Sequence, residues 1–161
     1  LVERWGEPAP GPGGLLLLPE AQQLASLGYY ELHVVGVEKR RADTLKRAAA
    51  HAVRLEQLAS LSGPALRSGL EAIPGIGAWT SAEVARVATG DADAVSVGDF
   101  HLKNLVAYAL AGEPRGTDER MLELLEPFAG HRGRVCLLIE SSGITAPKYG
   151  PRQRIQPLAR R

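Results

Sequence analysis

The amino-acid sequence predicts an all-α protein, on three observations. Apolar residues recur at helical spacing through most of the chain. No alternating apolar and polar run of strand length lies between turn signals. Hydrophobic residues make up 45% of the 161 residues and charged residues 23%. This composition suffices for a sizeable core and excludes a disordered chain, a collagen and a coiled coil.

The first elements are short. Gly and Pro crowd positions 6–19, so residues 1–19 are expected to be an irregular connector. A short helix is expected over 20–27, with Pro19 suited to its first turn. Residues 29–37 are apolar but too short and unpartnered to indicate a sheet. Residues 38–53 predict an amphipathic helix with one basic side.

The remaining segments continue the helical pattern. Gly90 and Gly143 mark helix ends, and a glycine-rich turn at residues 74–77 separates the helices expected over 62–73 and 78–89. We expect one helical domain over 20–144 and a basic, extended tail over 145–161. Further helices are expected over residues 55–61, 62–73, 78–89, 100–110, 118–128 and 134–141.

Charge is unevenly distributed, although the formal net charge is only +1. Residues 131–161 carry seven Lys/Arg and one acidic residue, or +6, which leaves −5 on the rest of the chain. A basic end on an acidic body points to an anionic partner such as nucleic acid. A solvated tail is the alternative interpretation.

The sequence disfavours disulfides, metal sites and membrane-spanning segments. The single cysteine, Cys136, cannot form an internal disulfide, a four-cysteine cluster or a Cys-rich zinc site, and the four His are scattered, so no metal site is expected. No apolar stretch approaches the ~20 residues needed to cross a bilayer. We expect a cytoplasmic monomer, nucleoid-associated if prokaryotic. The start at Leu1, without Met, suggests a processed or excised chain.

The segment LEAIPGIGAWTSAEVA, residues 70–85, predicts two helices joined by a tight hairpin. Pro74 forces the chain out of the first helix, and Gly75 and Gly77 allow dihedral angles that a Cβ forbids. The second helix then directs backbone N–H groups outward, which suits a phosphate. The alternative is a plain αα-corner with glycines for steric reasons.

The full pattern Leu-x-x-Ile-Pro-Gly-Ile-Gly-x-x-Thr resembles the helix-hairpin-helix motif of DNA repair proteins. Its form is similar to that of base-excision glycosylases in the helix-hairpin-helix/Gly-Pro-Asp superfamily, and Trp79 followed by Thr80 is similar to the 3-methyladenine DNA glycosylase II branch. Bifunctional members carry a lysine nucleophile at the position of Trp79. This chain has no lysine between Lys46 and Lys103, so the resemblance implies a monofunctional enzyme.

Asp99 provides a second match. The family places a catalytic aspartate at a helix start about twenty residues beyond the hairpin, and Asp99 in VSVGDFHLK stands twenty residues after Trp79. Cleavage of an N-glycosidic bond builds positive charge on the sugar, which an ionised carboxylate offsets while it aligns the attacking water. An ordinary helix N-cap is the alternative role, and the two roles are compatible.

The resemblance implies hydrolysis of 3-methyladenine and 7-methylguanine from double-stranded DNA, which leaves an abasic site. Alkylated purines are cationic, so aromatic side chains could hold the flipped base by cation–π attraction or could simply fill the core. The candidates for this wall are Trp79, Tyr29 and Tyr30. The candidates for DNA contacts are the amides of Gly75 and Gly77, the Thr80 hydroxyl and Lys103.

The resemblance covers about residues 36–143, a helical bundle, and has two departures. Relatives have helices that precede the equivalent of Trp5, so we expect the C-terminal portion of a longer enzyme. Gly98 stands where many relatives have Asp. A non-catalytic helix-hairpin-helix DNA-binding module, or an inactive fragment, is therefore the alternative function. No cofactor is expected beyond a monovalent cation at the hairpin carbonyls, which the family implies.

Overall fold

The structure is a computed structural model that describes residues 1–147. Within this range every regular element is a helix, and the one β-pairing is an isolated antiparallel bridge between Pro8 and Leu16. The all-α prediction is confirmed. None of the helices in residues 1–147 has the length and apolar character needed to cross a membrane.

Four helices form the N-terminal part. Helix α3 was not expected from the sequence, and α1 lies inside the expected irregular connector. Leu32 of α3 is fully buried and packs with Leu27 and Ala42, so tertiary contacts stabilise this short helix. The Glu31 carboxylate also accepts a hydrogen bond from the Gly28 amide at 2.8 Å. The bounds are α1 Val2–Trp5, α2 Ala21–Ser26, α3 Tyr29–Val34 and α4 Lys39–Ala50.

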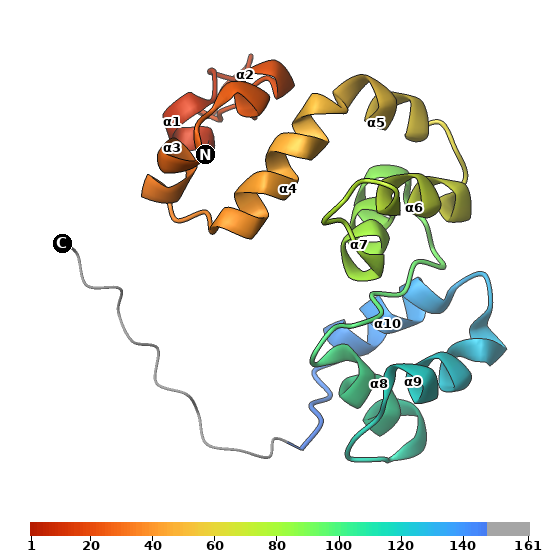
Figure 1. The fold of residues 1–161 in the computed structure, drawn as a ribbon. Helices are drawn as coiled ribbons and strands as arrows, with labels where there is room; N and C mark the ends of the chain where they lie inside the picture. Colours follow the sequence, from red (N-terminus) through yellow and green to blue (C-terminus); the bar gives the residue numbers. More distant parts are fainter. Residues whose placement is uncertain (148–161) are drawn as a thin grey trace.

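The middle part contains the predicted hairpin. The long helix expected to end at residue 53 stops at Ala50, and the chain turns at His51 into a separate helix. Helices α6 and α7 pack against each other on either side of the glycine-rich turn (Figure 1). The bounds are α5 Ala52–Leu58, α6 Gly63–Glu71 and α7 Ala78–Thr89.

The C-terminal part packs three helices around one core. The helix expected to end at residue 128 loses its α geometry at Leu125 and closes in a single 3-10 turn that contains a proline. Of the expected tail, residues 148–161 lie outside the described residues. The bounds are α8 Leu102–Ala111, α9 Asp118–Leu125, the 3-10 turn Glu126–Phe128 and α10 Arg132–Ser141.

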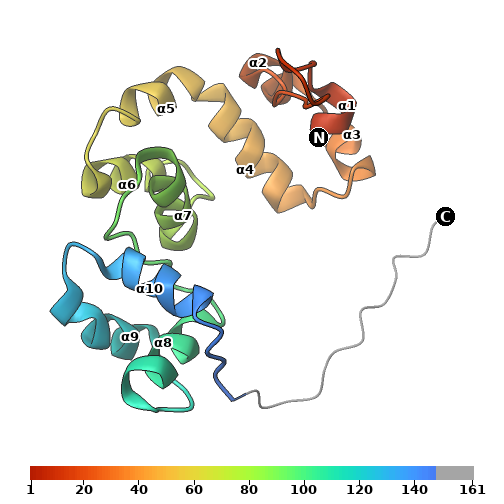
Figure 2. The same cartoon turned by 180° about the vertical axis from the view of Figure 1, so that it is seen from behind.

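Three separate clusters of buried side chains follow one another along the chain, and Figures 1 and 2 show the matching groups of helices from opposite sides. One cluster joins α2–α4, one joins α6, α7 and Ala94 of the following loop, and one joins α8–α10. The second and third groups meet through the loop between α7 and α8, which carries Asp99.

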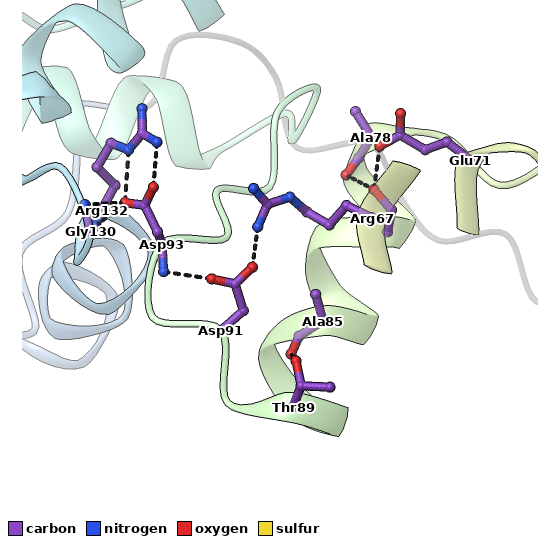
Figure 3. A network of polar contacts seen from close by, with 10 residues as sticks. Arg67, Glu71, Ala78, Ala85, Thr89, Asp91, Asp93, Gly130 and Arg132 are labelled. Carbon is purple, nitrogen blue, oxygen red and sulfur yellow. Dashed lines mark hydrogen bonds and ion pairs between the residues drawn. The ribbon is translucent and has the colours of Figure 1, made fainter. Parts of the chain in front are cut away.

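Two aspartates hold that loop in place (Figure 3). Asp91 forms an ion pair with Arg67 of α6 and accepts the Asp93 amide. Asp93 forms an ion pair with Arg132 of α10 and accepts the Gly130 and Arg132 amides at 2.9 and 3.0 Å. The loop is thus attached to both neighbouring helices before it reaches Asp99.

Helix α10 also approaches the loop closely at Gly133. A Cβ at this position would collide with the backbone of Ala94, so only glycine fits there. Cys136 and Ile139 continue the same buried side of α10 into the C-terminal core. The contact sets the distance between α10 and the loop, and a pocket lies between α10 and α7.

Candidate active site

Asp99 lies just before α8, and its two carboxylate oxygens have different partners. Oδ1 accepts hydrogen bonds from the backbone N–H groups of His101 and Leu102 at 2.7 and 2.8 Å. Oδ2 accepts one from the indole Nε1–H of Trp79 at 3.2 Å. The first pair satisfies free donors of the helix start, as an N-terminal cap does. The second orients the carboxylate toward α7.

These contacts control the charge of Asp99. Partial burial disfavours the carboxylate, but the hydrogen bonds from Leu102, His101 and Trp79 outweigh it, so the pKa of Asp99 lies below its ordinary value. The side chain is therefore a fixed anion at neutral pH. A fixed anion suits stabilisation of a developing cation better than it suits donation of a proton.

The hairpin positions the Trp79 indole. Gly75 has a φ of +101° and lies against Thr44 of α4, so a side chain there would be strained and crowded. Buried Ser81 of α7 donates to Glu71 of α6 at 2.6 Å, which joins the two helices. Trp79 follows in the first turn of α7 and remains 46% exposed while it contacts Asp99.

A pocket of about 210 Å³ contains both residues. It is a groove between α7 and α10, and its charged lining is mostly acidic, since Asp99, Glu83 and Glu140 outnumber Arg86. Its volume lies below the ~300–1,000 Å³ typical of drug-sized ligands, so it suits a ligand about the size of one base. The complete lining is Trp79, Glu83, Arg86, Ala94, Ser96, Asp99, Leu102, Gly133, Cys136 and Glu140.

The structure does not bring Tyr29 and Tyr30 to this pocket. Both lie on α3, and the Tyr29 ring contacts His33 and the Lys39 ammonium group instead. Tyr30 is 77% exposed on the same helix. Trp79 is consequently the one aromatic residue in the pocket lining among residues 1–147.

The candidate DNA contacts divide into two places. Gly75, Gly77 and Thr80 lie together at the hairpin, and the amides of the two glycines have no partner among the described residues. Lys103 lies on α8, where its ammonium group is 3.6 Å from the Asp118 carboxylate. The conformational role expected for Gly77 is wrong, because φ −111° and ψ −178° are open to any residue, and a Cβ would meet empty space.

The cation implied by the resemblance meets a competing charge at one carbonyl of the hairpin. The Pro74 oxygen accepts a hydrogen bond from Nη1 of Arg47 at 2.6 Å. A guanidinium is a permanent cation and repels a second cation at the same oxygen. Pro74 therefore does not fit the role of an ion ligand. Among residues 1–147, no group of three or more His, Cys, Asp or Glu is arranged to hold a metal.

Glu83, Arg86 and Ser96 also line the pocket, although no sequence motif singles them out. Glu83 and Arg86 follow Trp79 at i+4 and i+7, so helical spacing alone places Trp79, Glu83 and Arg86 on one side of α7. Glu83 accepts a hydrogen bond from Ser96 at 2.5 Å and pairs with Arg86 at 2.5 Å. This spacing can be read from the sequence, but the sequence does not show that this side of α7 faces a pocket.

No protein-family model and no curated protein matches the sequence. Solved structures do match. A DNA-3-methyladenine glycosidase from Bacillus halodurans aligns at a TM-score of 0.63 and 24% identity, over 78% of this chain and 60% of its own. The 3-methyladenine DNA glycosylase of Schizosaccharomyces pombe, in complex with abasic DNA, aligns at 0.70 and 21% identity, over 82% and 67%.

A third match, 3-methyladenine DNA-glycosylase from Archaeoglobus fulgidus, aligns at a TM-score of 0.67 and 21% identity, over 87% of this chain and 49% of its own. The chain thus spans between about half and two thirds of the length of these proteins. It shares the all-helical fold of these three structures, as the resemblance implied.

Proposed function

We propose that this chain acts in base-excision DNA repair as a monofunctional glycosylase. It hydrolyses the N-glycosidic bond of alkylated purines, such as 3-methyladenine and 7-methylguanine, flipped from duplex DNA, and it leaves an abasic site. The observation that carries this proposal is an anionic Asp99, oriented by Trp79, on the wall of a pocket suited to one base.

The chemistry needs little more than this anion. A purine alkylated on a ring nitrogen is cationic in DNA, so it departs as a neutral base and takes the electron pair of the C1′–N bond. The positive charge then resides on the sugar, where a nearby carboxylate stabilises it. Water adds to C1′ and loses a proton, and Asp99 aligns this water. The acidic excess in the pocket lining also favours a cationic base over a neutral one.

Strand cleavage is not part of the proposal. A lysine amine at the first turn of α7 would form a Schiff base with the opened sugar. Trp79 occupies that position and its N–H donates to Asp99 instead. The expected product is therefore an intact strand with one abasic site.

Duplex DNA is the proposed partner. The hairpin amides of Gly75 and Gly77 face no acceptor among residues 1–147, and the empty space beside Gly77 leaves room for a DNA backbone. The structural neighbour from S. pombe is itself in complex with abasic DNA. Backbone amides hold phosphates without formal charge, so the near-neutral net charge of the chain is compatible with DNA binding.

The test is Asp99→Asn, assayed as free base released from methylated duplex DNA. Asparagine keeps an oxygen that can accept from the amides of α8 but lacks the charge, so we expect base release to fall at least about 100-fold with duplex affinity retained. Asp43→Asn is the matched control, since it removes an aspartate of α4 that pairs with Lys39 and lies outside the pocket lining. Undiminished release by Asp99→Asn contradicts the proposed role of Asp99. Salt-sensitive duplex binding by the wild type without any base release assigns the non-catalytic binding function instead.

A further inference from the structure

The side of α7 that lines the pocket changes from aromatic to charged along its length. Trp79, which contacts Asp99, lies at the start of the helix. Glu83 lies about one turn further, and Arg86 nearly another turn beyond, at ~1.5 Å of rise per residue. A base whose glycosidic bond lies at Asp99 and which extends along α7 therefore presents its far edge to Glu83 and Arg86.

Glu83 has capacity for another hydrogen bond. Its Oε1 accepts from the Ser96 hydroxyl and its Oε2 from Nη2 of Arg86, each at 2.5 Å. An ionised carboxylate offers about four acceptor sites, so roughly two remain. The side chain is 31% exposed, which leaves it accessible from the pocket. It can accept a hydrogen bond only from a ligand that carries an N–H or O–H.

Arg86 supplies the complementary group. Its hydrogen bond to Glu83 uses one of five N–H groups, and within residues 1–147 no other hydrogen-bond partner is present. Its Nε is the one buried side-chain polar atom of the described residues that lacks a partner. Such unsatisfied donors are uncommon in folded proteins. The guanidinium therefore retains donors for an acceptor on a ligand.

We infer that Glu83 and Arg86 are specificity residues of the proposed glycosylase, and that they recognise the far edge of the flipped purine by hydrogen bonds. This inference rests on the proposed function. Glu83 accepts from the exocyclic amino group, and Arg86 donates to the adjacent unsubstituted ring nitrogen. The pocket therefore takes purines alkylated away from this edge, such as 3-methyladenine, and rejects purines whose amino group is blocked.

Rejection follows from the charge of Glu83. In 1,N6-ethenoadenine a two-carbon bridge joins N1 to N6 and removes both amino hydrogens. A carboxylate that faces this edge loses water and gains no donor, which is costlier than a missing contact. Trp79 stacks equally on either base, because every base has a π face. Between the two free bases, which are both uncharged, discrimination therefore depends on the Glu83 and Arg86 pair.

The experiment compares how the full chain binds and releases two bases. Calorimetry compares the affinities of free 3-methyladenine and free 1,N6-ethenoadenine, and a release assay compares methylated duplex DNA with duplex that contains 1,N6-ethenoadenine. We expect the wild type to bind 3-methyladenine at least about tenfold more tightly, as one charge-assisted hydrogen bond supplies. Equal affinities overturn the inference.

Glu83→Gln is the decisive variant. The amide N–H of glutamine can donate to the acceptor nitrogen that the etheno bridge leaves at position 6. The ratio of the affinity for 3-methyladenine to that for 1,N6-ethenoadenine is therefore expected to fall about tenfold, and the ratio of the two release rates is expected to fall with it. A misfolded variant lowers both members of the ratio together and leaves the ratio unchanged. Arg86→Met is expected to weaken 3-methyladenine binding about tenfold. An unchanged affinity ratio in a folded Glu83→Gln protein contradicts the inference.

The control is Glu38→Gln, which removes the carboxylate of another Glu–Arg pair at i,i+3 spacing, exposed at the start of α4 and outside the pocket. It is expected to change neither ratio. The two assays also separate this inference from the proposed function. Selective binding of free 3-methyladenine without release from DNA contradicts the glycosylase proposal alone, whereas release of both bases with equal affinities contradicts the specificity inference alone.

Discussion

Replacement of Asp93 by Asn tests how the loop that carries Asp99 is held. The carboxylate forms an ion pair with Arg132 and accepts the amides of Gly130 and Arg132 (Figure 3). Asparagine has nearly the same shape and keeps one acceptor oxygen, so the substitution removes the charge and few packing contacts. We expect a folded protein with a less stable loop.

The magnitude follows from the pKa of Asp93. The Arg132 side-chain hydrogen bond, which outweighs the opposing effect of burial, lowers this pKa from 3.8 to about 2. With ~1.4 kcal/mol per pKa unit, the ionised carboxylate stabilises the folded state by about 2 kcal/mol at pH 7. The side chain is only 23% exposed, so solvent screens the pair weakly. For a chain of this size, Asp93→Asn should lower the melting temperature by ~4–8 °C.

The pH dependence has a defined sign. Because the folded-state pKa is the lower one, the unfolded chain takes up a proton first as the pH falls below about 4, and the stabilisation is lost progressively toward pH 2. Thermal melts followed by circular dichroism at pH 7 and pH 3 measure this effect. The difference between wild type and Asp93→Asn should shrink to about half at pH 3. An equal difference at both pH values refutes the electrostatic explanation. Asp43→Asn, which breaks an exposed pair with Lys39, should change stability by less than about 1 kcal/mol.

Two further predictions concern the hairpin. Gly75→Ala should destabilise the fold by about 1–3 kcal/mol, since the φ of Gly75 is +101° and Thr44 lies against it. Gly77→Ala should leave the melting temperature unchanged and weaken duplex affinity, measured by fluorescence anisotropy. Loss of stability in Gly77→Ala, or undiminished DNA binding, contradicts this division of roles. Arg47→Met should remove the hydrogen bond to the Pro74 carbonyl and lower stability by about 1–3 kcal/mol in chemical denaturation, and a neutral result means that this contact contributes nothing.

Local patterns predicted the centre of the molecule well. Helix α7 begins and ends where its periodicity and flanking glycines indicated, from Ala78 to Thr89. Asp99, twenty positions after Trp79, caps the start of α8 and also accepts a hydrogen bond from the Trp79 indole. The helix bounds and the cap are features of short segments, in which helix period and capping chemistry depend on neighbouring residues alone. The hydrogen bond from Trp79 is a tertiary contact that no local pattern predicts.

The segments that the sequence did not predict correctly depend on tertiary contacts. Helix α3 is six residues long, too short to be stable by itself, and it depends on burial of Leu32 against Ala42 of another helix. The tyrosines of the same helix were candidates for the base pocket because aromatic residues are few. Their distance from Asp99 depends on how α3 packs on α4, and no local pattern encodes that packing.

The residues alone specified an all-α chain, the hairpin and the anion at the start of α8, because helix spacing, proline and glycine restrictions and capping act over a few positions. Tertiary structure decided which surfaces meet. Only the packing of α10 against the loop at Gly133, and the attachment of that loop through Asp91 and Asp93, turn one side of α7 into a pocket wall. Glu83 and Arg86 become candidate binding groups through that contact between distant segments.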